Sequence, residues 1–437
     1  MNILHKYQEK RALLASITGG ILLAGSMLPA AASDDNKFVF SGDVRAGWLE
    51  YNYGNPDGNP EINKGHKDSE GFYIVPKLSL TTPSYSGFSG KITLAGATDF
   101  GLNDEDKESR LFVFDPVENE PFAILQELFV EYNSEQNHFL VGRNEIYTPM
   151  IDADDYYMLA NSFAVAAFKN SSFENTGIHA GYFYEMAGVW DSGANGTEFH
   201  SMSDASFVPQ VNKDEADDTG IYYGAVDYNN STHHAQLWNY YATDLYNTLF
   251  AQYNLIKKTG SMGHNFGAQF IDFSQVGKLK SSETDIDYNI FSLKYDAAFD
   301  NGWSIASGAA KYSDGDGQGS TLGAWGGYPY FANGMIFHFF EAGSLRDASS
   351  YKLQGGYDFS KTTKARTALY ARYTYFDLNP AYSISSDGQP QDFMKMIGLQ
   401  LKQSYLKGGY FAATYENHKI DHEHNVWALR LIGGYKF

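Results

Sequence analysis

The sequence predicts an all-β fold: a transmembrane antiparallel β-barrel of about 18 strands, with long extracellular loops, short periplasmic turns and a constriction loop folded into the lumen. Three observations predict it. Segments of about ten residues alternate apolar with polar side chains. Short polar turns alternate with long acidic or Gly-rich connections. The composition of 33 Tyr, 31 Phe, 43 Gly and only 12 Pro suits strands with one apolar face that end in aromatic girdles.

The first 32 residues have the features of a secretory signal peptide. Lys6, Lys10 and Arg11 precede a moderately apolar run that ends at small residues before Ser33. We expect cleavage between Ala32 and Ser33, which leaves 33–437 as a single barrel domain. No later stretch approaches the roughly 18 to 20 apolar residues of a helical membrane span.

The first strand already has two distinct faces. Over 37–51, one face carries apolar side chains from Phe38 to Trp48, and the other carries Ser41, Asp43 and Arg45. The same period of two predicts further strands in chain order. They are 72–82, 91–100, 124–133, 138–146, 162–172, 176–187, 219–228, 234–243, 246–256, 264–273, 286–299, 303–312, 350–359, 365–376, 392–403, 407–417 and 425–437.

The connections alternate in length from the first strand onward. The short turns are 83–90, 133–136, 173–177, 229–232, 257–263, 300–302, 360–364 and 404–407. The long connections are 102–123, 147–161, 188–218, 274–284, 313–349 and 377–390. This alternation is typical of outer-membrane barrels, in which an even strand number places both termini on the periplasmic side.

The last strand ends on an aromatic residue. Its apolar face would contact lipid, with Trp427, Tyr435 and Phe437 in the aromatic girdle and Arg430 on the opposite face. An aromatic C-terminus also resembles the signal by which the outer-membrane assembly machinery recognises barrels. The alternative interpretation of this segment is an edge strand of a soluble sheet.

Composition excludes several classes of function. The chain has no cysteine, which excludes a disulfide-stapled domain, a zinc–thiolate cluster and a thiol nucleophile. The formal net charge of -20 indicates acidic loops and argues against a nucleic-acid partner.

Basic residues within strands occupy the face opposite the apolar one, where the lumen would be. An arginine facing lipid near the midplane costs roughly 2 to 4 kcal/mol, which favours this placement. We therefore predict a basic ladder along the pore wall. Its members are Arg45, Arg143, Lys352, Arg366, Arg372, Lys402 and Arg430. The alternative is that these cations brace the wall by pairing with inward acids such as Asp43, Glu127, Glu131 and Asp358.

The connection after Arg143 is the candidate constriction. Loops of barrels can fold inward, and acids there would oppose a basic wall and set a transverse field. The predicted constriction residues are Thr148, Pro149, Asp152, Asp154, Asp155, Tyr156 and Asn161. The alternative is an outward, solvated acidic loop.

Residues 142–163, GRNEIYTPMIDADDYYMLANSF, resemble the strand end and constriction loop of the OprD-type family of substrate-selective outer-membrane porins. Arg143 matches the strand-end arginine of that family, and Thr148 and Pro149 match its Thr-Pro. Other loop matches are Met158, Leu159, Asn161 and Phe163. Segments 237–256 and 322–334 also resemble family segments. Three positions depart from the pattern: Asn144 replaces Gln, Ala160 replaces Pro and Val165 replaces Gly.

The resemblance implies an 18-stranded barrel, an inward third loop, a basic ladder and small carboxylates, including amino acids, as solutes. The sequence therefore predicts a porin of a Gram-negative outer membrane, selective for small carboxylates or amino acids. A general, weakly selective porin is the first alternative. A structural barrel, an adhesin or an outer-membrane enzyme is a further alternative. No Ser/His/acid grouping stands out, so we predict neither an enzyme nor a cofactor.

The expected partners are outer-membrane lipid, lipopolysaccharide, small anionic or zwitterionic solutes and the barrel assembly machinery. Monomer and homotrimer both stay open. His418, His422 and His424 lie close together in the last extracellular connection, and imidazoles bind transition metals. A loop supplies no fixed scaffold, so we predict no metal site. Whether this loop binds a metal ion stays an open question at the level of sequence.

Overall fold

The computed structural model describes residues 37–59, 66–103, 121–154, 158–188, 198–204, 219–281, 286–336, 345–363, 366–405 and 408–437. The predicted signal peptide lies outside these residues. Among the described residues, no helix is both long and apolar enough to cross a membrane.

Strands make up most of the structure. They are β1 (Val39–Asn52), β2 (Ser69–Thr81), β3 (Phe88–Ala97), β4 (Phe122–Asn133), β5 (Asn137–Asn144), β6 (Ser162–Phe173), β7 (Thr176–Ala187), β8 (His200–Ser201), β9 (Ile221–Asn229), β10 (His233–Ala242), β11 (Tyr246–Thr259), β12 (Met262–Gln275), β13 (Asp287–Phe299), β14 (Trp303–Tyr312), β15 (Ser349–Asp358), β16 (Arg366–Asp377), β17 (Phe393–Ser404), β18 (Gly409–Ile420) and β19 (Val426–Lys436). Short helical turns are η2 (Met202–Asp204), η3 (Gly277–Ser281), α2 (Gln318–Thr321) and η5 (Phe359–Lys361).

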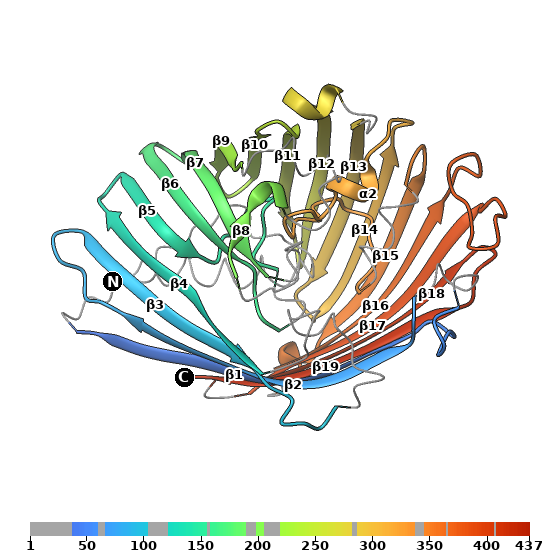
Figure 1. The fold of residues 1–437 in the computed structure, drawn as a ribbon, viewed down its shortest axis with the longest axis horizontal. Helices are drawn as coiled ribbons and strands as arrows, with labels where there is room; N and C mark the ends of the chain where they lie inside the picture. The colour runs from blue at the N-terminus through green and yellow to red at the C-terminus, as the bar shows by residue number, and fades with distance from the viewer. Residues whose placement is uncertain are drawn as a thin grey trace.

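The strands form one antiparallel sheet that closes on itself. β1 pairs with β2 on one side and with β19 on the other, and these strands lie together along one side of the ring (Figure 1). β7 pairs with β9 along most of its length and with the two-residue β8 at its end. The sheet has 19 strands, so eighteen without β8 form the closed barrel. The predicted fold class is confirmed.

Each predicted strand coincides with one long strand, with its ends shifted by a few residues. β2 begins at Ser69 rather than at 72, and β11 continues to Thr259 rather than ending at 256. The sequence did not predict β8, because two residues show no periodicity. The expected alternation of short turns and long loops is also confirmed, with two exceptions on the long-loop side: only residues 243–245 connect β10 to β11, and only 421–425 connect β18 to β19.

The outer surface of the barrel is apolar. Val130 and Val141 are each 59% exposed, and Leu353 is 58% exposed. Their neighbours on the same strands point inward and are buried, as in Glu131, Leu140 and Gln354. Exposing such a continuous apolar band to water would be unfavourable, whereas the hydrocarbon core of a membrane is as apolar as the band itself.

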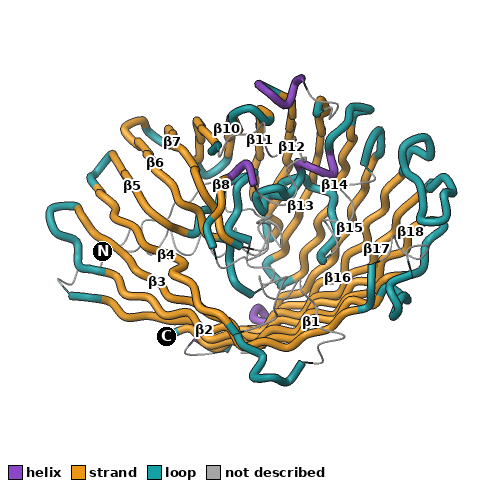
Figure 2. The backbone as a smooth tube through the Cα atoms, in the orientation of Figure 1, coloured by secondary structure: helices purple, strands orange, loops and turns teal. Residues whose placement is uncertain are grey.

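The inner face of β10–β14 changes character along the strands. Near the long-loop ends it carries fully buried aromatic side chains, namely Trp238, Tyr240, Tyr246, Phe273, Tyr288 and Tyr312. Nearer the short turns it carries polar side chains, namely Gln252, Asn254, Asn265, Lys294 and Asp296. Loop segments lie inside the ring (Figure 2). The ring of Trp325 from one such loop lies 5.2 Å from that of Tyr246. Burial of each such aromatic contributes roughly 2 to 3 kcal/mol, so this half of the wall is core.

Candidate pore constriction and lumenal site

The loop between β5 and β6 enters the barrel at a tight turn over residues 148–151. The Thr148 amide and hydroxyl each lie 2.8 Å from the carbonyl oxygen of Ile151 and donate to it. The Ile151 amide donates to the Thr148 hydroxyl at 3.2 Å. Pro149 suits such a turn because its ring fixes φ. The Thr-Pro pair thus directs Ile151, which is fully buried, into the lumen.

The same loop is anchored to the first strands of the barrel. Arg45 Nη1 donates to the carbonyl oxygen of Met158 at 3.1 Å, and Gln126 Nε2 donates to that of Ala160 at 2.9 Å. The sulfur of Met158 fills the space where a side chain at Gly47 would lie. Met158 itself has a φ of 71°, a conformation that side chains seldom adopt. The loop is therefore held on the wall by specific contacts.

A second loop, between β14 and β15, also folds into the lumen. Its carbonyl groups at 332–334 accept hydrogen bonds from the wall: Ser350 to Ala332 at 3.0 Å, Thr374 to Asn333 at 3.0 Å and Arg372 to Gly334 at 2.6 Å. Glu416, which is fully buried, accepts from the backbone amides of Met335 and Ile336.

The sequence predicted 313–349 only as a long extracellular connection. The inward course of this loop was missed, although a signal was available. Its segment LGAWGGYPYFANG is too apolar and aromatic for a solvated loop.

The two inward loops meet at their tips. The Asp152 amide donates to the carbonyl oxygen of Trp325 at 2.9 Å, and Ile151 forms bridges with Trp325 and Gly326. Asn161 Nδ2 donates to the carbonyl oxygen of Asp152 at 3.1 Å. The Trp325 indole donates to the carbonyl oxygen of Met202, so the segment before β9 joins the junction. This junction places the Asp152 carboxylate at the edge of the remaining space.

That space is a cavity of about 480 Å³ bordered by the loops and by β9–β16. Its acidic side chains are Asp152 and Asp154 from the first loop, Asp227 from β9 and Asp296 from β13. Its cations are Lys294, Lys352 and Arg372. Amide side chains are Asn229, Gln236, Gln252, Asn254, Asn265, Asn333 and Gln354, and aromatic ones are Tyr228, His234, Tyr328, Tyr330 and Phe331. Lys294 lies 3.2 Å from Asp296.

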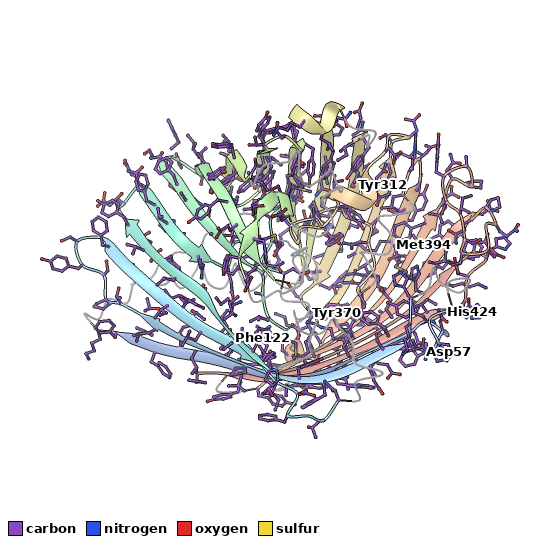
Figure 3. The ribbon with its side chains drawn as sticks, viewed as in Figure 1. Asp57, Phe122, Tyr312, Tyr370, Met394 and His424 are labelled. Carbon is purple, nitrogen blue, oxygen red and sulfur yellow. The ribbon has the colours of Figure 1, made fainter. Side chains whose placement is uncertain are left out.

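Of the predicted ladder, Lys352 and Arg372 line this cavity. Arg430 points inward, in register with the buried Leu49 and Thr414. Arg366 and Lys402 have the inward parity of their strands and are exposed near the short turns. Tyr370, on the same face as Arg372, is labelled inside the ring in Figure 3. Arg45 instead pairs with Asp43 at 2.9 Å beside the first loop.

Arg143 departs from its predicted placement. Its backbone pairs with Leu128, which is 49% exposed on the outer face. Its guanidinium carbon lies 3.9 Å from the ring centroid of Phe199, a cation–π contact. Phe139 and Val141, four and two residues earlier, are also exposed on the outer face, so the regular alternation of β5 gives Arg143 the outward parity. We therefore place Arg143 beside the segment that leads into β8 and not in the ladder.

The bracing alternative describes the first strands well. Glu127 pairs with Lys91 at 2.7 Å, and Glu131 pairs with His138 at 3.0 Å. Asp358, in contrast, accepts from the backbone amide of Ser360.

The other predicted residues have clear positions. Thr148 and Asn161 are buried at the loop junction, and the Pro149 carbonyl oxygen lies where a side chain at Gly327 would be. Asp155 and Tyr156 lie outside the described residues. Tyr435 and Phe437 are each 49% exposed on the outer face, and Trp427 shares that face.

The three histidines that lie close together in the sequence do not form a cluster in the structure. His418 is buried on the inner face of β18, whereas His422 is exposed, and His424 lies with Asp57 at one rim in Figure 3. Among the described residues, no group of three or more His, Asp or Glu side chains is arranged to hold a metal ion.

The base of the second inward loop carries an ion pair outside the strands' membrane-facing part. Asp347 Oδ1 accepts from Lys311 at 2.7 Å, and its other oxygen accepts from Asn379 at 2.9 Å. These two hydrogen bonds, the one from Lys311 foremost, lower the pKa of Asp347 below its usual range. The carboxylate form therefore fastens the end of this loop to the neighbouring β16–β17 loop.

No family model matches the sequence, and the search of curated proteins finds no match. Solved structures do match. OccAB4 of Acinetobacter baumannii has a TM-score of 0.74 at 14% identity over 92% of this chain and 99% of its own. A BenF-like porin from Pseudomonas fluorescens Pf-5 has a TM-score of 0.70 at 14% identity over 92% and 98%. OpdK of Pseudomonas aeruginosa, solved with vanillate, has a TM-score of 0.69 at 13% identity over 91% and 98%.

At these identities the likeness is one of fold. It extends over almost the whole described barrel and agrees with the resemblance seen in residues 142–163. The chain therefore has the fold of the OprD-like and Occ outer-membrane porins.

Proposed function

We propose that this chain is a porin of a Gram-negative outer membrane through which small carboxylates or amino acids diffuse. The observation that carries the proposal is the lumenal cavity, in which Lys352 and Arg372 share one space with Asp152 and Asp154. The apolar outer band supplies the membrane-facing surface. The structural neighbours include a BenF-like porin and a protein solved with vanillate, which is a carboxylate.

Three neutral acceptors of the protein orient Arg372. Its Nε donates to Gln354 Oε1 at 2.9 Å, and its Nη1 donates to the carbonyl oxygens of Asn333 and Gly334. These three contacts fix the guanidinium without neutralising it, and Arg372 lines the cavity. The interaction energy of two unit charges 4 Å apart is about 4 kcal/mol at an effective dielectric constant of 20. The guanidinium therefore attracts the carboxylate of a solute.

The acids of the first loop give the cavity its second sign of charge. Asp152 and Asp154 come from the constriction loop, whereas Lys352 and Arg372 come from β15 and β16. A solute between them experiences a transverse field, which favours zwitterions or carboxylates aligned with it. In this proposal Arg366 and Lys402 extend the ladder toward the short turns, and Arg430 adds a cation on β19. Arg45 anchors the loop.

The proposal has further parts that follow from the barrel. The girdle residues Trp427, Tyr435 and Phe437 would meet lipid and lipopolysaccharide, and the aromatic C-terminus would engage the assembly machinery. We infer no enzymatic activity. Whether the barrel is a monomer or a homotrimer would be determined separately, by measuring the molar mass of the detergent-solubilised protein.

Planar-bilayer recording tests the proposal. The refolded mature chain should give a small single-channel conductance that added small carboxylates partly block, and a reversal potential in a salt gradient that depends on Arg372. A large conductance indifferent to solutes would replace the proposal with a general porin. Absence of any channel would reject porin function and return the structural-barrel and enzyme alternatives, which a hydrolase assay separates.

A further inference from the structure

We propose that the lumenal cavity favours hydroxylated carboxylates, anions that carry several hydroxyl groups besides the carboxylate, over aliphatic and aromatic ones. This inference rests on the proposed porin function and names the solute class of the same site. It is carried by three glutamine side chains that line the cavity: Gln236 on β10, Gln252 on β11 and Gln354 on β15.

The orientation of two of these amides is fixed by partners that can only donate. Gln236 faces the indole nitrogen of Trp238 at 3.0 Å, and Gln354 faces Nε of Arg372 at 2.9 Å. Indole and guanidinium N–H groups have no acceptor, so the atom that faces each must be the amide oxygen. The amide nitrogen of each glutamine is therefore turned away from that partner.

The orientation of Gln252 follows from a chain of two bonds. Gln269 lies 2.9 Å from the carbonyl oxygen of Pro329, which only accepts, so the Gln269 atom must be its amide nitrogen. The same nitrogen lies 2.9 Å from Gln252, so its second proton is donated to the amide oxygen of Gln252. The amide nitrogen of Gln252 then points away from Gln269.

Three amide N–H groups thus face the cavity beside its cations. Within the described part of the chain, none of the three amide nitrogens makes a hydrogen bond to the protein. Gln236 is 9% exposed and Gln354 6%, and among the described residues neither amide nitrogen is one of the fully buried polar atoms without a partner. Each nitrogen therefore keeps accessible surface, on a side chain that lines the cavity. A solute that fills the cavity must offer oxygen acceptors, or these donors lose their water without replacement.

Hydroxyl groups meet this demand better than other solute groups. A hydroxyl accepts a hydrogen bond from an amide N–H and donates its own proton to a carboxylate such as Asp227 or Asp154, which border the same cavity. An aliphatic chain or an aromatic ring accepts from none of the three glutamines. An ammonium group only donates, so it can pair with the acids but leaves the amides unsatisfied.

Gln252 is the residue to change. Its amide oxygen holds only Gln269, whereas Gln236 and Gln354 also position Trp238 and Arg372. Gln252→Met keeps the length of the side chain and removes the donor. Gln400→Met is the matched control: Gln400 lies on the inner face of β17, outside the cavity lining, and donates to Thr414 at 3.1 Å.

The measurement is the permeability of gluconate relative to hexanoate, taken from bi-ionic reversal potentials of the full barrel in planar bilayers. Both anions have the same chain length, and sieving by size alone would make the bulkier gluconate the less permeant. We expect the wild-type barrel to prefer gluconate. Gln252→Met should lower this preference about fivefold, the factor that one net hydrogen bond supplies, while Gln400→Met leaves it unchanged.

The outcomes separate the two proposals. Preference for hexanoate, or a gluconate preference that Gln252→Met leaves intact, would overturn the inference while porin function stands. An equal loss in Gln252→Met and Gln400→Met would also overturn it, because the effect would then not come from the cavity. Failure of every carboxylate to carry current would overturn the porin proposal itself.

Discussion

The backbone amide of Asp152 donates to the carbonyl oxygen of Trp325 at 2.9 Å, and this bond joins the tips of two loops from opposite parts of the barrel. The next residue, Gly326, has a φ of 88°, and a side chain there would collide with the carbonyl oxygen of Asp152. This junction therefore requires glycine at position 326 for two reasons, its conformation and its small size.

Replacing Gly326 with alanine should loosen this junction. The left-handed backbone alone disfavours alanine by about 1 to 2 kcal/mol, and the collision with Asp152 adds to that. We expect a larger and noisier single-channel conductance from a barrel that still folds, as judged by its electrophoretic shift on boiling. Gly388→Ala is the control, since Gly388 has a φ of 81° with open space around it. Equal conductance in the two variants would show that the junction does not limit the pore.

Replacing Arg372 with glutamine should lower the preference for anions. The chloride-to-potassium permeability ratio should fall about threefold, as expected when one charge is removed from a wet pore. The reversal potential in a KCl gradient measures this ratio. Lys395→Gln removes the same charge from a position on β17 where the lysine lies 4.0 Å from the ring centroid of Phe393, away from the cavity. If Arg372→Gln kept the wild-type reversal potential, as Lys395→Gln is expected to do, Arg372 would not belong to the ladder.

Replacing Glu416 with glutamine should detach the second inward loop. The buried carboxylate accepts from two backbone amides, and an amide side chain can present an oxygen to only one of them. We expect a loss of about 1 to 3 kcal/mol in the docking of this loop, visible as faster proteolysis near 335 and as increased conductance. Glu423→Gln is the control, because Glu423 accepts from the amide and hydroxyl of Ser386 in an outer loop. Unchanged proteolysis in Glu416→Gln would contradict this role.

The strands could be predicted from the sequence because their signal is local. In β1 and β19 the period of two is visible within a few residues, because the bilayer favours apolar side chains at the outward positions of its hydrocarbon band. The placement of Arg372 and Lys352 on the inner face followed from that parity alone. Arg143 did not follow, because it shares the parity of Phe139 and Val141, which are exposed on the outer face.

The loops could not be placed in the same way, since their positions depend on contacts between distant residues. Nothing near Gly326 in the sequence indicates that it meets Asp152, and nothing near Glu416 indicates two loop amides. The cations show the same limit. Parity places both Arg45 and Arg372 inside. Only contacts with distant residues show that Arg45 holds the first loop at Met158, whereas Arg372 holds the second loop and lines the cavity.

Barrel closure depends on a glycine on the first strand. Gly42 and Phe437 exchange both backbone hydrogen bonds, at 2.9 and 3.0 Å, and the aromatic ring of Phe437 lies over Gly42. A side-chain carbon at Gly42 would lie 2.5 Å from that ring. Gly42→Val should therefore displace the C-terminal aromatic residue and slow closure between β1 and β19. We expect a lower yield of folded barrel in refolding from urea, followed by the electrophoretic shift. Gly355→Ala, on β15 with nothing within 4 Å, is the control for adding a side chain to a strand glycine. Wild-type refolding of Gly42→Val would mean that closure does not need Phe437 in this position.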